Sequence, residues 1–494
     1  MKKKRVLSSA IAAALGVSLI SAVPSQASVV GLYGDIDRDL TVAASDVNLL
    51  ASHILDVSTL DAMGHMLSDL DTSSQLNAVD LCLLKRAALG IDELDYIYSE
   101  EPLIETPIEK LDASCPTTGD VKMLVFEIEF SDCKFSTSFD VNEVEQAIFG
   151  PEDTSSSYYP YESVTAYLDR SSYGRLNMTG DVFTYTASGS IADYNEDKVK
   201  LVEEVLDYYE ASVDFSEYDA DGDDVIDCSA FFVPSSASSD YWWPMSGGFG
   251  DPSYTVDGLY VGNIITGNSV PTSRTDYVTT IIHEMGHTMG LPDYYKYEDT
   301  NDWEGLHGDA GYEMMDDAYG DYSSLSKLML GWYQESEISV YDNTMAEQTF
   351  TLTSAQHSPN FVLIPGETLG NDYFGEYFII EYVTADENNT MWWNESAGIR
   401  ILHAQTEVYT YDYWNISVFA YDNYGPLYDG DDGIRFVRLV NDNNGYFTSG
   451  DIIDSSVSGF AWYDSNGQET VDTGLSISVD SFSNGEYTIT ISQN

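Results

Sequence analysis

The chain has 494 residues, which is too long for one ordinary hydrophobic core and indicates about two to four domains. Because 43% of its residues are hydrophobic and 13% are aromatic, it can fill such cores and is not of the disordered class. Its 83 acidic residues outnumber 20 basic ones. The formal net charge of −63 repels DNA, RNA and anionic lipid, which argues against nucleic-acid and membrane-surface partners.

Residues 1–27 have the layout of a signal peptide. Basic residues 2–5 precede an apolar and small-residue run from Ile11 to Val23, and Ser25-Gln26-Ala27 fits the small-x-small cleavage pattern. The apolar run is too short to span a bilayer, and no other stretch reaches about 18 apolar residues. The sequence therefore predicts a secreted, extracellular protein without a membrane span.

Two Asp-rich loops repeat 34 residues apart, and each leads into an apolar, helix-like run, at 47–54 and 81–89. Calcium binds roughly six to eight oxygens, and alternating residues of a tight loop point their oxygens at one centre. Unrelated Asp-rich turns are the alternative, but they do not account for a repeat that feeds a helix twice. Loop positions 1, 3, 5, 7 (backbone carbonyl) and 12 are Asp35, Asp37, Asp39, Thr41 and Asp46 in the first repeat and Asp69, Asp71, Ser73, Gln75 and Asp80 in the second.

Residues 31–90 resemble a type I dockerin, a calcium-dependent module that binds cohesin domains on a scaffold protein. The resemblance implies a small all-α calcium-binding module over residues 28–92 and attachment to a cohesin-bearing, cellulosome-like extracellular scaffold. The chain departs from the family pattern at loop position 6, where the usual glycine is Leu40 or Ser74, and at Ser73, so the second site is expected to be the weaker. In this family loop positions 10 and 11 help choose the cohesin; here they are Ala44-Ser45 and Ala78-Val79.

Residues 93–117 are acidic, contain three prolines and show no clear period, so they are predicted to form a linker. The four cysteines are too few for a disulfide scaffold. Cys82 lies in a helix-like segment and is expected to be a core thiol. At most one pair forms among Cys115, Cys133 and Cys228, and the sequence leaves that pairing open.

A globular pattern with mixed helices and strands extends from residue 118 to 345. Strands are predicted at 123–130, 176–185 and 225–233, and helices at 160–170 and 196–213. From 346 to 494 the pattern changes to short β runs separated by turn residues, which predicts an all-β, sandwich-like domain. The fold class expected for the whole chain is multidomain: a small all-α module, an α/β (α+β) domain and a C-terminal β domain.

A predicted helix over residues 273–289 carries the strongest chemical signal. His283 and His287 are four residues apart, so both imidazoles lie on one face and can bind a single ion. Glu284 is next to the first ligand and is placed to polarise the water that zinc activates. Gly290 can end the helix with a positive φ, after which Asp293 returns as a third ligand through oxygen.

The full pattern is HExxHxxGxxD, and its glycine and acid make it more specific than HExxH alone. Downstream, Gly311–Asp316 fits a Met-turn, with Met315 as the methionine beneath the metal. Glu304 or Glu313 as the third ligand is the alternative, but Gly290 and Pro292 set up the shorter return. Tyr319 and Tyr322 lie near the Met-turn, and the sequence selects neither as a catalytic group.

These motifs resemble the immune-inhibitor-A-type secreted metalloproteases of bacteria, a metzincin-like family. The resemblance covers about residues 120–490 and extends to the segments Val164–Leu176, Asp321–Trp332, Glu376–Tyr382 and Gly398–His403. It implies a zinc endopeptidase in which His283, His287 and Asp293 bind zinc, where many metzincins use a third histidine, and Glu284 transfers protons to and from the reacting groups.

A further oxygen-rich loop precedes the strand predicted at 225–233. Asp219, Asp221, Asp223 and Asp227, with the Val225 carbonyl, can hold a structural calcium. The alternative is a plain acidic turn before a strand.

Together the sequence predicts a secreted zinc metalloendopeptidase that hydrolyses peptide bonds in proteins, with catalytic Zn²⁺ and structural Ca²⁺, docked on a scaffold. The alternative is a scaffold-attached, non-catalytic binding protein with a degenerate protease domain. The intact ligand set and Glu284 argue against that alternative.

Overall fold

The chain divides into two compact units in the computed structural model, one formed by Met1–Pro102 and Gln334–Ser336 and a larger one formed by Leu103–Tyr333 and Glu337–Asn494. Its strands outnumber its helices among the described residues, so the fold is of the mixed α/β class. The structure describes residues 29–32, 36, 42–55, 57, 60, 68, 70, 76–89, 91, 96–98, 103–111, 114–136, 139–194, 197–237, 239–268, 274–295, 311, 313–390, 397–411, 416–423, 433–441 and 446–494.

The smaller unit contains two helices, α2 (Ala44–Ile54) and α4 (Ala78–Ala88), at the positions where the sequence predicts helical runs. Leu50 and Leu84, 34 residues apart like the loops, are fully buried and form one hydrophobic cluster with the buried Ile36. Strand β1 (Val29–Leu32) pairs antiparallel with β2 (Tyr96–Tyr98), so the two ends of this unit lie side by side.

The first sheet of the larger unit has five strands in the order β4–β3–β6–β9–β7, and β7 pairs antiparallel with β9 whereas the other neighbours are parallel. The central strand β3 is a nearly continuous apolar run because both of its faces are covered. Met123 and Val125 face the core that contains α6 and α9, whereas Leu124 and Phe126 face the core that contains α7. The bounds are β3 (Gly119–Glu129), β4 (Leu176–Thr186), β6 (Cys228–Val233), β7 (Met245–Gly248), β9 (Asn263–Asn268), α5 (Val141–Phe149), α6 (Val164–Ser171), α7 (Lys198–Tyr209), α8 (Ser239–Trp242) and α9 (Arg274–Thr288).

Two further sheets make up the C-terminal region, in the orders β10–β12–β13–β14–β17 and β11–β22–β21–β18. Side chains from both sheets share one hydrophobic core, which is compatible with the sandwich-like arrangement expected from the sequence. The bounds are β10 (Ile338–Val340), β11 (Glu347–Leu352), β12 (Phe361–Pro365), β13 (Glu376–Val383), β14 (Gly398–Gln405), β17 (Val437–Leu439), β18 (Ile452–Ile453), β21 (Leu475–Ser483) and β22 (Glu486–Gln493), with the hairpins β15 (Val408–Tyr411)/β16 (Ile416–Phe419) and β19 (Ala461–Tyr463)/β20 (Glu469–Asp472).

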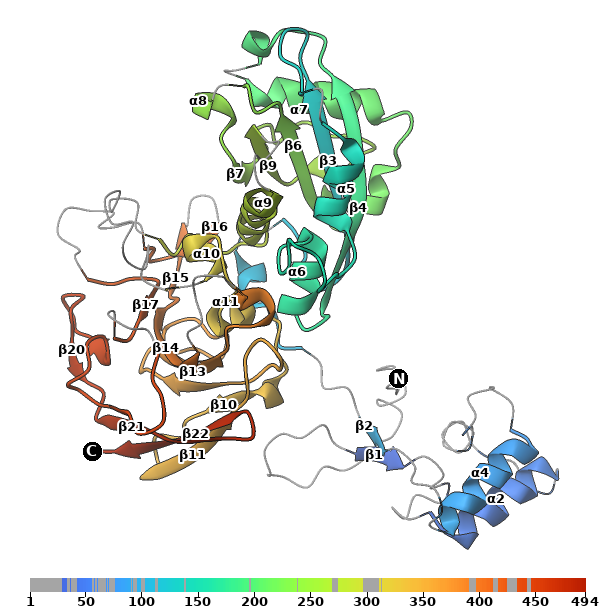
Figure 1. The fold of residues 1–494 in the computed structure, drawn as a ribbon, viewed down its shortest axis with the longest axis vertical. Helices are drawn as coiled ribbons and strands as arrows, with labels where there is room; N and C mark the ends of the chain where they lie inside the picture. The colour runs from blue at the N-terminus through green and yellow to red at the C-terminus, as the bar shows by residue number, and fades with distance from the viewer. Residues whose placement is uncertain are drawn as a thin grey trace. The chain divides into compact units, whose positions relative to one another are not determined.

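Strand β13 connects the two halves of the larger unit because its alternating side chains enter different cores. Phe378 and Ile380 pack toward the second C-terminal sheet, whereas Tyr377 and Ile379 join the core around α9. Figure 1 shows α9 between the first sheet and the C-terminal strands. The shared core joins residues on both sides of 345, and the domain boundary expected there stays a prediction.

The segment interpreted as a linker has structure in its second half. Residues after Leu103 belong to the larger unit, where Ile108 and Cys115 are buried in the core around α9. The Ile104 N–H donates to the Tyr333 carbonyl at 2.9 Å, and the Trp332 indole N–H donates to the Thr117 carbonyl at 2.6 Å. Its few apolar residues are too widely spaced to form a recognisable period, yet Ile108 and Cys115 enter the core, and Ile104 and Leu111 pack against it.

A buried imidazole lies between two carboxylates in the C-terminal region. Fully buried His403 on β14 contacts Glu376 through Nε2 at 2.9 Å and Glu469 through Nδ1 at 2.8 Å. Arg438 contacts the other Glu469 oxygen at 2.8 Å. Burial acts to lower the pKa of His403, but the two carboxylates outweigh it and raise the pKa. The imidazolium therefore holds β13, β14 and the β19/β20 hairpin together.

We expect His403→Ala to lower the free energy of unfolding by about 3–5 kcal/mol, because the buried Glu376 loses its cation and Glu469 keeps only Arg438. His357→Ala is the control, since His357 is exposed and paired with the exposed Asp386. In the wild type the raised pKa of His403 adds stability below the unfolded value of about 6.5, and this stability disappears as the pH rises through the folded value. Denaturant unfolding at several pH values measures both effects, and equal losses in the two variants would contradict the assignment.

Candidate metal centre

Helix α9 provides two histidines whose ring orientations are fixed by backbone carbonyls. His283 Nδ1 lies 2.8 Å from the Met314 carbonyl, and His287 Nδ1 lies 2.8 Å from the Leu291 carbonyl. A carbonyl only accepts hydrogen bonds, so each Nδ1 must carry a proton and donate it. Each Nε2 then has a free lone pair unless the ring is positively charged, which is the arrangement of metal-binding histidines.

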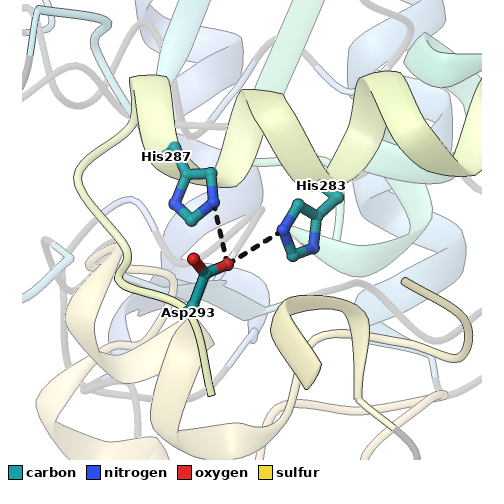
Figure 2. A group of neighbouring side chains, drawn as sticks. All are labelled: His283, His287 and Asp293. Carbon is teal, nitrogen blue, oxygen red and sulfur yellow. Dashed lines mark hydrogen bonds and ion pairs between the residues drawn. The ribbon is translucent and has the colours of Figure 1, made fainter. Parts of the chain in front are cut away.

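The chain leaves α9 through a tight turn that returns Asp293 to the same point. Gly290 has φ of 101°, which favours glycine, and the Leu291 N–H donates to the Gly286 carbonyl at 2.9 Å. Asp293 Oδ1 lies 3.1 Å from His283 Nε2 and 3.0 Å from His287 Nε2. Figure 2 shows the two imidazoles pointing from the helix toward this one carboxylate oxygen.

Three electron-rich atoms meeting at one point require a cation. Two imidazole lone pairs and a carboxylate oxygen repel one another at about 3 Å unless a proton or a metal ion lies among them. The pKa of His287 reflects the need for a positive charge: burial acts to lower this pKa, but the Asp293 carboxylate outweighs burial and raises it. The residues therefore fit a divalent ion that takes two nitrogens and one oxygen.

Glu284 lies beside the ligands without being one of them. Its side chain is buried, and burial raises its pKa above the usual range, although the neighbouring His283 and His287 oppose the shift. The Ser246 backbone N–H, on strand β7, donates to the Glu284 carboxylate. The Ser246 hydroxyl also lies 3.0 Å from the Thr288 hydroxyl, so β7 and the last turn of α9 lie side by side.

The predicted Met-turn packs beneath the ligands. Short helix α10 (Met314–Asp317) begins here, and the Met314 carbonyl is the group that orients His283. The Met315 carbonyl accepts the Tyr294 N–H at 2.9 Å, which fixes the residue next to Asp293. Fully buried Met315 lies so close to Gly286 that a Cβ at position 286 would clash with its sulfur.

Glu313, one of the alternative third ligands, has a different role in the structure. Its buried carboxylate accepts the Ser323 N–H at 3.0 Å and the Ser326 hydroxyl at 2.6 Å. It thereby connects the Met-turn to helix α11 (Ser324–Met329), and its oxygens are occupied. The other alternative, Glu304, lies outside the described residues.

The two tyrosines near the Met-turn also have other partners. The Tyr322 hydroxyl donates to the Ile282 carbonyl of α9 at 2.8 Å, and the Tyr319 hydroxyl donates to Asp276 at 2.8 Å. Sequence reasoning missed Tyr295, whose ring stacks on His283 with 6.0 Å between centroids. It also missed Asn423, whose amide donates to the Tyr294 carbonyl at 2.7 Å. Only the position of Tyr295, two residues after Asp293, gave a signal.

The structure brings together Asp219, Asp221, Asp223 and Asp227. Asp219 accepts the Gly222 N–H at 2.7 Å, and Asp223 accepts the N–H of Val225, the first residue of β5 (Val225–Ile226), at 2.9 Å. Asp227 is 1% exposed, and its Oδ1 has no hydrogen-bond partner among the described residues. Burial and the neighbouring aspartates raise the pKa of Asp227 to about 7. A buried, unpaired carboxylate oxygen inside an acidic loop calls for a cation.

Of the residues predicted in the repeated loops, the structure describes Asp46 and Asp80, whereas Asp35, Asp37, Asp39, Thr41, Asp69, Asp71, Ser73 and Gln75 lie outside the described residues. Both described carboxylates are fully buried. Asp46 accepts the N–H groups of Ile36 and Ala43 at 2.7 and 2.8 Å, and Asp80 accepts those of Leu70 and Asn77 at 2.9 and 3.0 Å. The two repeats therefore close their loops with the same pair of hydrogen bonds.

Comparison with known proteins adds no relative: no protein-family model matches the chain, and no curated protein matches it. Among the residues that the structure describes, no helix is both long and apolar enough to cross a membrane.

We expect Gly286→Ala to destabilise the larger unit by about 1–3 kcal/mol, because the added Cβ would clash with Met315. Met315→Ala removes the clashing sulfur, at the cost of a cavity of its own. The double variant should therefore lose less stability than the sum of the two single variants. Denaturant unfolding of all four proteins measures this coupling, and strictly additive losses would show that the two side chains do not meet.

Proposed function

We propose that this chain is a secreted zinc metalloendopeptidase. The observation that carries the proposal is the convergence of His283 Nε2, His287 Nε2 and Asp293 Oδ1 on one point, with both Nδ1 atoms held by carbonyls. His283 and His287 would hold a zinc ion through nitrogen and Asp293 through oxygen, and three protein ligands of this kind are typical of catalytic rather than structural zinc sites. The buried, non-ligand carboxylate of Glu284 beside them favours hydrolysis.

The chemistry divides between the metal and the chain. When bound, zinc lowers the pKa of a water and polarises the carbonyl of the substrate. Glu284 accepts the proton of the attacking water and later donates it to the leaving amine, and its raised pKa suits both steps. The carbonyls of Met314 and Leu291 keep both imidazoles in the ligand tautomer, and Asp293 supplies the negative charge that holds the ion.

The position of β7 supports an extended polypeptide as the substrate. In the sheet order β4–β3–β6–β9–β7 this strand is at the edge, and its Ser246 contacts Glu284. A peptide that adds to an edge strand is held by backbone hydrogen bonds, so any extended sequence can bind. Gly247 and Gly248 keep the edge free of bulky side chains. This arrangement also supports a metzincin-like assignment for the first sheet and α9.

The smaller unit is proposed to be a dockerin that binds a cohesin domain of an extracellular scaffold. The identical hydrogen bonds of Asp46 and Asp80 support two related calcium loops. Exposed apolar side chains recur at equivalent positions after the two helices, Leu55 and Val57 after α2 and Leu89 and Ile91 after α4. Apolar side chains repeated in this way on a small unit favour a protein partner.

The loop with Asp219 and Asp227 is proposed to bind a structural calcium. The Asp227 oxygen without a hydrogen bond and the backbone amides that orient the other aspartates support this assignment. Such an ion would fix the segment that leads into β6.

We expect Glu284→Gln to lower protein cleavage by roughly 10²–10⁴-fold while keeping one zinc per chain, because the ligands remain but proton transfer is lost. His287→Ala should lose both zinc and activity. Glu347→Gln on the exposed edge of β11 is the control and should cleave like the wild type. Casein cleavage with and without chelator, together with metal analysis, tests the set. Wild-type cleavage by Glu284→Gln would refute the mechanism.

We expect Asp227→Asn to abolish the rise in melting temperature that calcium gives the larger unit. Asp224→Asn is a matched control, because Asp224 lies in the same loop outside the cluster and its φ of 66° suits asparagine. All eight tryptophans lie after residue 103, so their fluorescence reports on this unit alone. An equal calcium response in the two variants would argue against the site.

We expect immobilised type I cohesin domains to retain the chain in calcium and to release it in a calcium chelator. Asp46→Ala combined with Asp80→Ala should abolish retention, because both loops lose their closing carboxylate. Asp227→Asn changes a carboxylate of the other unit and should leave retention intact. Failure of every cohesin in a broad panel to retain the wild type would remove the docking proposal and leave the peptidase proposal untouched.

A further inference from the structure

Two of the four cysteines lie together in the core beneath α9. Cys115, in the segment before β3, and Cys228, the first residue of β6, are both buried in the hydrophobic cluster that contains Met285 of α9. Cys133 belongs to the cluster on the other face of the sheet, where its sulfur lies 3.2 Å from the Ser236 hydroxyl. Cys82 is exposed on α4 of the smaller unit, so the expectation of a core thiol there is wrong.

The backbone holds the segments of Cys115 and Cys228 side by side. The Ser114 hydroxyl donates to the Asp227 carbonyl at 3.4 Å and accepts the Asn263 N–H at 2.8 Å. Ser114 also packs against Gly262, where a Cβ would stand only 2.7 Å from the Ser114 Cβ. Ser114 and Asp227, the residues immediately before the two cysteines, are therefore in direct contact. The space between Ser114 and Gly262 is too small for another side chain.

The Cys115 sulfur lies 3.5 Å from the Pro116 carbonyl, and its thiol also interacts with that of Cys228. A hydrogen bond between the thiols of Cys115 and Cys228, followed by burial, raises the pKa of Cys115 well above its usual value. The Cys228 sulfur in turn lies 3.2 Å from the Met285 sulfur. Met285 is the residue after Glu284, so the Cys228 sulfur packs against the turn of α9 that carries Glu284.

We propose that Cys115 and Cys228 form a disulfide in the exported protein, and this rests on the proposed export. Each thiol loses one proton and one electron, a sulfur–sulfur bond forms, and a disulfide donor of the export compartment is reduced to two thiols. The bond would close a loop of more than about 100 residues and tie the N-terminal segment of the larger unit to β6. Cys133 and Cys82 stay reduced.

The disulfide would stabilise the core that packs against α9 and would take no part in the proposed hydrolysis. Reduced, residues 103–117 are held to the core by Ile104, Ile108 and a few hydrogen bonds. With the disulfide formed, the same segment would be covalently attached to Cys228, the residue after Asp227 of the proposed calcium loop. The ion and the disulfide would thus fix the same end of β6, against which Met285 packs.

The test uses the full chain exported into an oxidising compartment, alkylated in denaturant without reductant, digested and analysed by mass spectrometry. We expect one peptide pair joining Cys115 to Cys228, with alkyl groups on Cys82 and Cys133. Alkylation of both Cys115 and Cys228, or a bond from either to Cys133, overturns the proposal. Neither result depends on peptidase activity, so failure here is distinct from failure of the proposed function.

A thermal test separates the bond from packing. The melting temperature is measured by tryptophan fluorescence. Reductant should lower it by several degrees in the wild type and by the same amount in Cys133→Ala. It should leave Cys115→Ala/Cys228→Ala unchanged, because that variant has no bond to lose. An equal effect of reductant on all three proteins would contradict the disulfide.

Discussion

The hydrogen bonds from His283 and His287 to backbone carbonyls are the constraint on which the site depends. Without them either imidazole can rotate or change tautomer, and its lone pair no longer points at Asp293. One of the two carbonyls, that of Leu291, belongs to the turn that follows α9, and the other, that of Met314, comes from the Met-turn. The hydrogen bond to the Met314 carbonyl therefore requires a segment about 30 residues away along the chain to pack against α9. Gly286 permits this packing because it has no side chain to keep Met315 away.

Helices α6 and α11 and strands β13 and β14 meet at two buried polar clusters. Asp321 accepts the Ser171 hydroxyl at 2.5 Å and the Asn388 amide at 3.0 Å, and fully buried Lys327 contacts it at 2.7 Å. A second buried pair, Arg400 and Glu381, binds the start of α11 through the Ser324 hydroxyl at 2.7 Å. Because a buried charge without its partner is costly, these groups specify how α6, α11 and the C-terminal strands fit together. They act on the site through Glu313, which connects α11 to the Met-turn.

Local patterns predicted the elements and the ligand candidates, and long-range contacts account for what they missed. The strands at 123–130 and 176–185 correspond to β3 and β4, and the helix at 273–289 corresponds to α9, because period and composition are local properties. The strand at 225–233 is broken into β5 and β6 at Asp227, whose buried carboxylate belongs to the acidic loop. Asn423 escaped prediction because its role depends on a fold contact with Tyr294, 129 residues away. The placement of Cys115 and Cys228 in one core cluster escaped for the same reason.

The C-terminal strands complete the candidate site rather than form an appendage. The sheet that contains β13 presents apolar side chains on both faces, so removing either neighbouring layer would expose one of them to water. Tyr377 and Ile379 fill the core against which α9 and α11 pack, and the Asn423 amide fixes the carbonyl of the residue after Asp293. The residue after Asp293 is thus held from two sides, by Met315 through the Tyr294 N–H and by Asn423 through the Tyr294 carbonyl. A change in the C-terminal core that shifts either contact would move Asp293, although none of the C-terminal residues that the structure describes belongs to the His283–His287–Asp293 cluster.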